Sequence, residues 1–115
     1  MIEIKSYRGE NNIRLTMNGH ACFNPGNDIV CAAASMLSQT FLNALRAMEE
    51  RGELTAFHAE DTKEGELYIK AEAGKHMEKV LILYDAFLPG FMALSESYPE
   101  NVRLTLPKGV GGNRK

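Results

Sequence analysis

The chain lacks most of the features that mark secreted, membrane-bound or nucleic-acid-binding proteins. It has only two cysteines in 115 residues, and its net charge at pH 7 is −2. No apolar run approaches the ~20 residues that a membrane-spanning helix needs. No N-terminal segment combines a basic start, an apolar centre and a small-residue cleavage site. We therefore expect a cytoplasmic protein with free thiols and no membrane partner. We do not expect nucleic acid to be its ligand, because no global positive field would attract it.

The composition that remains is typical of one small globular domain. Apolar residues make up 44% of the chain and charged residues 24%, which is ordinary for a soluble fold. Residues 1–107 are enough for a single domain with its own core. Residues 108–115 place Lys108, Arg114 and Lys115 among glycines, which predicts a flexible basic tail.

Periodic hydrophobicity predicts the order of the elements. Apolar residues alternate with polar ones over residues 1–7, 13–18, 54–59, 66–71 and 102–106, as they do in half-buried strands. A helix should begin after Asp28 and end near residue 50, with Gly52 as its stop. A second helix should follow Gly74, kinked or broken at Pro89–Gly90. The order β-β-α-β-β-α-β predicts an α+β domain, a mixed sheet of about five strands covered by two helices.

The first helix should rest on the sheet through one apolar stripe. Residues at helical spacing along it are Ile29, Ala33, Leu37, Phe41, Leu45 and Met48. We expect this stripe to face the sheet.

The residues able to carry chemistry gather between Gly19 and Leu37. His20 follows a predicted strand, a loop rich in Asn, Pro and Gly comes next, and Cys31 falls in the first turn of the helix. Cysteine is a good nucleophile only as its thiolate, which the positive end of a helix favours. An imidazole nearby can take the thiol proton and return it to a leaving group. The pattern predicts a Cys/His protease whose oxyanion is held by N–H groups at the helix start, each typically worth ~3 kcal/mol.

Each of these residues also has a plainer interpretation. Cys31 could be a small buried apolar residue, and His20 alone is a weak signal. Asp28 could cap the helix, or orient His20 as the third member of a triad. Ser35 shares a helix face with Cys31 and could hold His20 or orient the substrate, or its hydroxyl could bond back to the Cys31 carbonyl.

The remaining cysteine and histidines carry weaker signals. Cys22 is interpreted as a spare thiol, although it could anchor the loop or act as a redox partner of Cys31. His58 within a strand is interpreted as a core or surface residue, and His76 as a solvated residue at a helix start. Zinc needs three or four ligands, and the local sequence offers no fourth beside His20, Cys22 and Cys31. We expect neither a metal nor a cofactor.

Three blocks of sequence together resemble a known family. Gly19–Ala21 reads GHA, Asp28–Ala32 reads DIVCA with Ser35 following, and Tyr98–Val102 reads YPENV. These blocks, at this spacing, resemble the ribosomal-processing cysteine proteases, the Prp family. The likeness covers nearly the whole chain.

The resemblance implies a homodimeric endopeptidase that removes the N-terminal extension of bacterial large-subunit ribosomal protein twenty-seven, cutting after an aromatic residue. It implies Cys31 and His20 as the catalytic pair, with Asp28 and Ser35 in support. It also implies a loop that closes over the substrate, formed here by Ala21, Cys22, Phe23, Asn24, Pro25, Gly26 and Asn27. The chain departs from the family pattern at Cys22, at Pro25 and at Pro89–Gly90.

Two other functions stay open at this point. The chain could be a non-catalytic module associated with the ribosome or RNA, its basic tail contacting phosphates and Cys31 merely packed. It could also be a relative that processes phage structural proteins.

Overall fold

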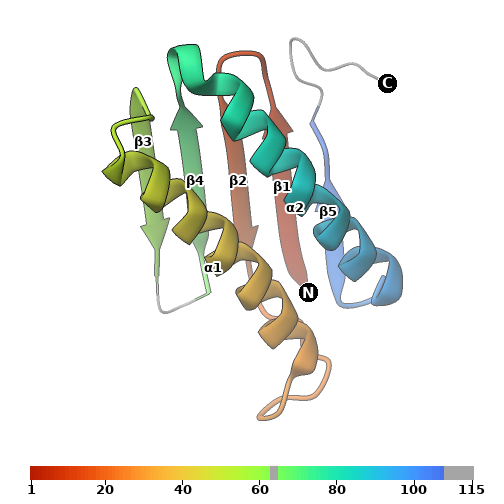
Figure 1. Cartoon of the computed structure of the whole chain (residues 1–115). Coiled ribbons are helices and arrows are strands. Elements are labelled where there is room, and N and C mark those ends of the chain that lie inside the picture. The colour runs from red at the N-terminus through yellow and green to blue at the C-terminus, as the bar shows by residue number, and fades with distance from the viewer. Residues whose placement is uncertain (63–64, 108–115) are drawn as a thin grey trace.

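Five strands form one mixed sheet, which confirms the predicted α+β class. The computed structural model describes residues 1–62 and 65–107, so the tail expected over residues 108–115 lies outside the described residues. The strands are β1 (Ile2–Arg8), β2 (Ile13–Asn18), β3 (Ala56–Asp61), β4 (Leu67–Glu72) and β5 (Val102–Thr105). They lie in the order β3-β4-β2-β1-β5 (Figure 1), with β1 and β5 parallel and the other neighbours antiparallel.

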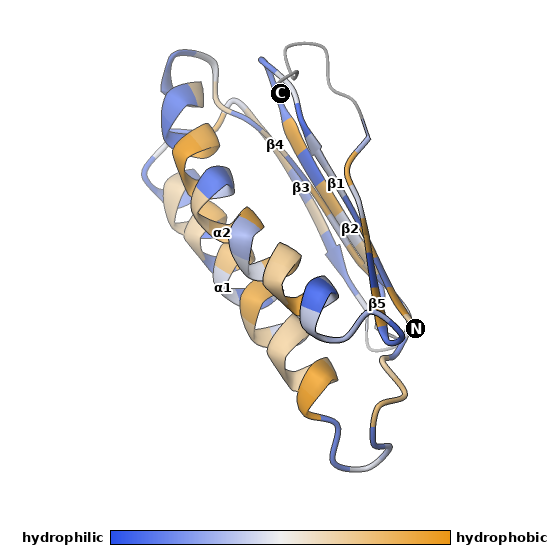
Figure 2. Cartoon of the chain, turned by 90° about the vertical axis from the view of Figure 1, so that its right-hand side faces the viewer, coloured by the Kyte–Doolittle hydropathy of each residue, from blue (hydrophilic) through white to orange (hydrophobic). Residues whose placement is uncertain are grey.

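Two helices cover one face of this sheet. Helix α1 spans Ile29–Glu50 and α2 spans Met77–Ser97, the latter preceded by the single 3₁₀ turn η1 (Gly74–His76). Figure 2 shows both helices on the same side of the sheet. The loop before α1 extends past the ends of the strands. Alternation along β1 explains the layering, because Ile2 and Ile4 are buried beneath the helices while Glu3 and Lys5 face solvent.

The predicted apolar stripe of α1 is wrong in the first half of the helix. Ile29 is 56% exposed, and the buried residues are Val30, Ala34, Ser38, Phe41, Leu42, Leu45 and Met48. Hydropathy cannot choose between stripes in a run of alanines. Close packing selects Ala34 and Ser38, whose small side chains let the helix approach the sheet. With this face of α1 turned toward the sheet, Cys31 lies half-buried at the margin of the core.

Helix α2 passes through Pro89 without a break, so of the two expected outcomes, a kink or a break, the break is wrong. Pro89 lies on the exposed side of the helix, where the carbonyl that loses its N–H partner can be solvated. Gly90 faces α1, and a Cβ at that position would lie 2.9 Å from Cδ2 of Leu37. Pro89 therefore faces solvent, while Gly90 allows α2 to pack closely against α1.

The segment Gly74–Ser97 is long and apolar enough, by length and composition alone, to cross a membrane. The sequence expectation that no such stretch exists is therefore wrong. The buried helices of soluble proteins pass the same test, and Met77, Val80, Tyr84, Phe91 and Leu94 of α2 are buried in the core.

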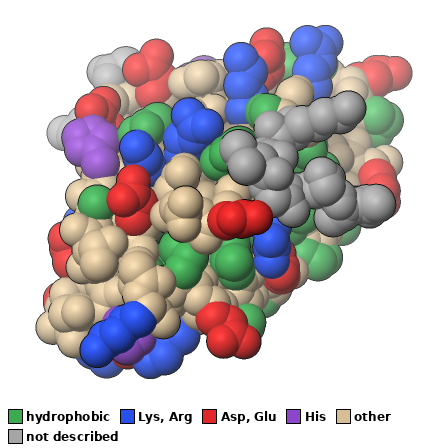
Figure 3. All heavy atoms as spheres, turned by 90° about the horizontal axis from the view of Figure 1, so that it is seen from above, with side chains coloured by type: hydrophobic (Ala, Val, Ile, Leu, Met, Phe, Trp, Pro, Cys, Tyr) green, Lys and Arg blue, Asp and Glu red, His purple; other side chains and the backbone are tan. Residues whose placement is uncertain are grey.

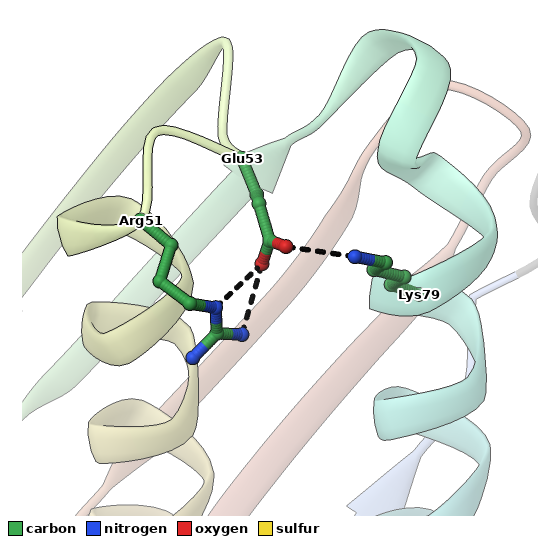
Figure 4. Close-up of polar contacts among 3 residues, drawn as sticks. All are labelled: Arg51, Glu53 and Lys79. Atoms are coloured by element: carbon green, nitrogen blue, oxygen red, sulfur yellow. Dashed lines mark hydrogen bonds and ion pairs between the residues drawn. The ribbon is translucent and has the colours of Figure 1, made fainter.

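The end of the domain opposite the loop before α1 is polar. Figure 3 looks down on this end and shows basic and acidic side chains interspersed. Here Glu53, whose side chain is only 13% exposed, accepts from Nζ of Lys79 at 2.7 Å and from Nη2 of Arg51 at 2.9 Å (Figure 4). These contacts, first that of Lys79 and then that of Arg51, lower the pKa of Glu53 to about 2. The ion pair between Glu53 and Lys79 connects the segment after α1 to α2.

Candidate active site

The turn after β2, the central strand, places His20 just beyond the end of the sheet. Gly19 has φ +96°, and a Cβ there would overlap the backbone carbonyl oxygen of Met1. The Met1 nitrogen donates in turn to the carbonyl oxygen of His20. Only glycine allows β2 to end this close to the start of β1. The glycine of the GHA block is thus needed on steric grounds to place His20 in this position.

Asp28 caps α1 and also binds the preceding loop. Its Oδ1 accepts from the backbone N–H groups of Val30 and Cys31, each at 3.0 Å. Its Oδ2 accepts from the N–H of Phe23 at 3.0 Å and of Asn24 at 3.4 Å. These bonds, that from Cys31 foremost, lower the pKa of Asp28. Both oxygens are thus used by backbone donors, and within residues 1–62 and 65–107 no hydrogen bond joins Asp28 to His20. The geometry favours the capping interpretation.

The sulfur of Cys31 faces the loop rather than the interior of the core. Cys31 is the third residue of α1, and its Sγ accepts from the backbone N–H of Ala21 at 3.2 Å. Ala21 itself is 1% exposed. The sulfur therefore lies at a helix N-terminus and accepts a hydrogen bond from a backbone donor.

His20 and Cys31 line the same cleft. It has a volume of about 290 Å³ and is bordered by α1, the end of β2 and the turn between β3 and β4. Residue Gly65 of this turn lies against the imidazole, since a Cβ on it would be 3.3 Å from Cε1 of His20. His20 is exposed, and no hydrogen bond between its ring and Cys31 occurs in the described part of the chain. The two groups therefore share a cleft without a direct hydrogen bond between them.

Ser35 also lines this cleft, together with Asp61 and Glu66 from either side of the β3–β4 turn. Its carbonyl accepts from the hydroxyl of Ser38 at 3.2 Å. The back-bond from its own hydroxyl to the Cys31 carbonyl, one of the two alternatives, does not occur in this structure of residues 1–62 and 65–107. Ser35 is exposed and open to a substrate.

The rest of the loop does not line the cleft that holds the sulfur. Cys22 is exposed and has φ +56°, an unusual value for a residue with a side chain. Phe23 is 46% exposed and packs edge-on against Tyr98, with ring centroids 5.3 Å apart.

Among the residues that the structure describes, no group of three or more His, Cys, Asp or Glu is arranged to hold a metal.

The other two histidines lie outside the cleft. His58 is exposed on β3, and its Nε2 lies 2.7 Å from Oε2 of Glu60, which confirms the prediction of a core or surface residue. His76 lies in η1 before α2.

Sequence reasoning missed two residues that hold the site together. Gly65 belongs to a stretch that the sequence marks only as a polar turn. Asn101 stands out in the sequence only as part of the YPENV block, yet its side-chain Nδ2 donates to the carbonyl oxygen of Ala21 at 2.9 Å. That block is the one signal in the sequence that could have pointed to it.

A comparison with known families agrees with this geometry. The family model described as cysteine protease Prp matches residues 1–103. The chain belongs to the Prp family of cysteine proteases. It is accordingly a cysteine peptidase.

Solved structures resemble the chain over nearly its full length. The crystal structure of SMU.848 from Streptococcus mutans is 32% identical, with a TM-score of 0.65, and the match covers 92% of this chain and 93% of that one. Two structures of the essential ribosomal processing protease Prp from S. aureus carry a covalently linked product peptide and a substrate peptide. They are 24% and 22% identical, with TM-scores of 0.70 and 0.69, covering 92% of this chain and 99% of theirs. At that identity they show the shared fold. A sequence search of curated proteins finds no match.

Proposed function

We propose that this Prp-family protease removes the N-terminal extension of a bacterial large-subunit ribosomal protein, number twenty-seven, using Cys31 as nucleophile and His20 as acid and base. The observation that carries the assignment of residues is the shared cleft. It contains an imidazole and a thiol that lies at a helix N-terminus and accepts a backbone N–H.

In the first step, the proton of the Cys31 thiol passes to His20 and the sulfur attacks the scissile carbonyl carbon. The new S–C bond moves the carbonyl electron pair onto oxygen, giving a tetrahedral oxyanion. His20 then gives its proton to the departing amine as the C–N bond breaks. A water molecule, deprotonated by His20, releases the acyl group and restores the thiol.

The position of His20 suits this exchange of protons. The ring is exposed and rests against Gly65, which has no side chain to restrict it. An imidazole so placed can turn between the sulfur and the leaving amine without disturbing the core.

A peptide substrate fits the open form of the cleft. Ser35 and the β3–β4 turn line the same cleft as Cys31, and the loop Phe23–Asn27 extends past the ends of the strands (Figure 1). The Prp of S. aureus has been crystallised with a substrate peptide, and a peptide as substrate for this chain is part of the proposal. We expect cleavage after an aromatic residue, with the loop closing over the bound segment.

The test is mass spectrometry of the ribosomal protein twenty-seven precursor from the same genome, incubated with wild-type protein, Cys31→Ala or Cys22→Ala. We expect a shortened product from the wild type and none from Cys31→Ala. Cys22→Ala is the matched control, because Cys22 is the only other cysteine in the chain. Cleavage that persists in Cys31→Ala but is lost in Cys22→Ala would show that Cys22, and not Cys31, is the nucleophile. Cleavage of a phage structural protein in place of the ribosomal precursor would refute the substrate.

We further propose that the protease works in the cytoplasm as a homodimer. Its helical layer exposes large apolar side chains, with Met36 of α1 68% exposed and Ile82 of α2 62% exposed. Apolar groups of this size on an outer face favour association with a second copy. Light scattering after size-exclusion chromatography should give twice the mass of the 12.8 kDa chain. A mass of one chain at micromolar concentration would refute the dimer.

A further inference from the structure

The turn between α2 and β5 makes a direct contact with the loop that carries the catalytic machinery. Nδ2 of Asn101 donates to the carbonyl oxygen of Ala21 at 2.9 Å, across 80 residues of sequence. Asn101 is itself held firmly, since its N–H donates to the carbonyl of Tyr98 at 2.9 Å and its carbonyl accepts from the N–H of Ile2 at 2.8 Å. The side-chain amide is therefore presented to Ala21 from a fixed backbone.

Ala21 connects this amide to the nucleophile. While its carbonyl accepts from Asn101, its N–H donates to Sγ of Cys31 at 3.2 Å. Ala21 is 1% exposed, so water does not compete for these bonds. A second contact, between the rings of Phe23 and Tyr98, joins the same loop to the same turn.

Three of the backbone donors at the start of α1 are already engaged. The N–H groups of Val30 and Cys31 donate to the Asp28 side chain, and that of Ala32 donates to the Asp28 carbonyl at 3.1 Å. The expectation that these groups hold the oxyanion therefore does not fit the structure. Within residues 1–62 and 65–107, the N–H of Ala21 is the backbone donor directed at the sulfur.

We propose that the Ala21 N–H is the donor that stabilises negative charge at the nucleophile, and that Asn101 is the residue that positions it. The inference rests on Cys31 being the nucleophile of the proposed reaction. In the free enzyme this N–H stabilises the thiolate. As the S–C bond forms, the charge moves from sulfur to the adjacent carbonyl oxygen, and the same donor follows it there. Asn101 contributes by keeping the Ala21 backbone from turning away.

The test compares Asn101→Ala, Asn101→Asp and Glu100→Ala. Asn101→Asp keeps the shape of the side chain, but its carboxylate cannot donate to a carbonyl. Glu100 is an exposed neighbour in the same turn and is the matched control. Peptide cleavage gives kcat and KM. The rate of iodoacetamide modification at Cys31, resolved from Cys22 by mass spectrometry, is followed from pH 5 to 10.

We expect both Asn101 variants to lower kcat about tenfold, with KM changed less than about twofold. Alkylation of Cys31 should slow at neutral pH, and the midpoint of its pH–rate curve should move upward. The charged groups around the sulfur are unchanged in Asn101→Ala, namely His20 from the loop, Asp28 from the cap, and Asp61 and Glu66 from the β3–β4 turn. A shift of the curve in that variant therefore reports the lost positioning. Glu100→Ala should match the wild type in every measurement.

Full activity in Asn101→Asp would overturn the proposal, because shape alone would then suffice. A wild-type alkylation curve in both Asn101 variants would also overturn it, as would a change confined to KM. If Asn101→Ala does not fold by circular dichroism, Asn101→Leu decides, because its side chain has a similar size and neither donates a hydrogen bond nor carries a charge. Failure of the wild type to cut the ribosomal precursor would refute only the proposed substrate, because alkylation of Cys31 is measured without it.

Discussion

The sharpest prediction concerns Gly19, where the backbone leaves no room for a side chain. In Gly19→Ala, the new Cβ would overlap the carbonyl oxygen of Met1, which is backbone and cannot rotate aside. The positive φ of +96° adds strain of its own. A left-handed conformation costs a residue with a side chain about 1–2 kcal/mol, and forcing an atom into packed structure costs a further ~1–3 kcal/mol. We expect Gly19→Ala to lose about 3–4 kcal/mol of unfolding free energy.

Thermal unfolding followed by circular dichroism measures this loss. For a domain of this size each kcal/mol lowers Tm by about 4–6 °C, so Gly19→Ala should melt about 12–24 °C below the wild type. Gly52→Ala is the matched control, because Gly52 has φ +74° but a Cβ added there would meet nothing within 4 Å. It carries the conformational strain alone and should lose about 1–2 kcal/mol.

Peptide cleavage provides a second measurement on the same variants. Gly19→Ala moves the segment that holds His20, so kcat should fall even at temperatures where the variant is folded. Equal melting temperatures for Gly19→Ala and Gly52→Ala would refute the steric argument. Wild-type kcat in folded Gly19→Ala would refute the link to His20.

Three further predictions test other parts of the structure. Gly65→Ala should lower kcat several-fold, because its φ is +83° and its Cβ would press on the imidazole of His20 at 3.3 Å; unchanged kinetics would show that this turn does not restrain the ring. Because the pKa of Glu53 is about 2 when folded and 4.5 ordinarily, its stabilising effect is complete above about pH 4.5 and is lost as pH falls toward 2. Melting curves should therefore show Glu53→Gln less stable than the wild type at pH 7, with the gap closing by pH 2, and a constant gap would contradict the ion pairs of Figure 4. Ile82→Asp should halve the mass measured by light scattering if α2 forms the dimer surface, while a far-UV spectrum like that of the wild type confirms that the monomer still folds.

Much of the fold follows from local pattern. Alternation of apolar and polar residues located all five strands, although β3 and β4 each begin a residue or two later than predicted. Asp28 is a cap candidate from the sequence because a carboxylate there satisfies N–H groups that the helix itself leaves free, and the structure selects this role over orienting His20. Because the helix begins directly after Asp28, Cys31 falls in its first turn. The position of the proposed nucleophile on the helix is therefore a local property of the chain.

Long-range contacts decided the remainder. The alanine run of α1 offers several stripes of similar hydropathy, and only packing against the sheet selected Val30, Ala34 and Ser38. The backbone donor directed at the Cys31 sulfur is the N–H of Ala21, ten residues earlier in the chain, and only the folded loop brings the two groups together.

The amino-acid sequence by itself determined which residue types stand beside the loop, since a capped helix start, a cysteine and a histidine are set by neighbours in the chain. Only the tertiary structure decided how the loop is held. The contact between Asn101 and Ala21 joins residues 80 positions apart, and no periodicity or propensity encodes the meeting of two segments so distant. Such a pairing depends on β1 and β5 lying side by side, and this follows from the fold as a whole.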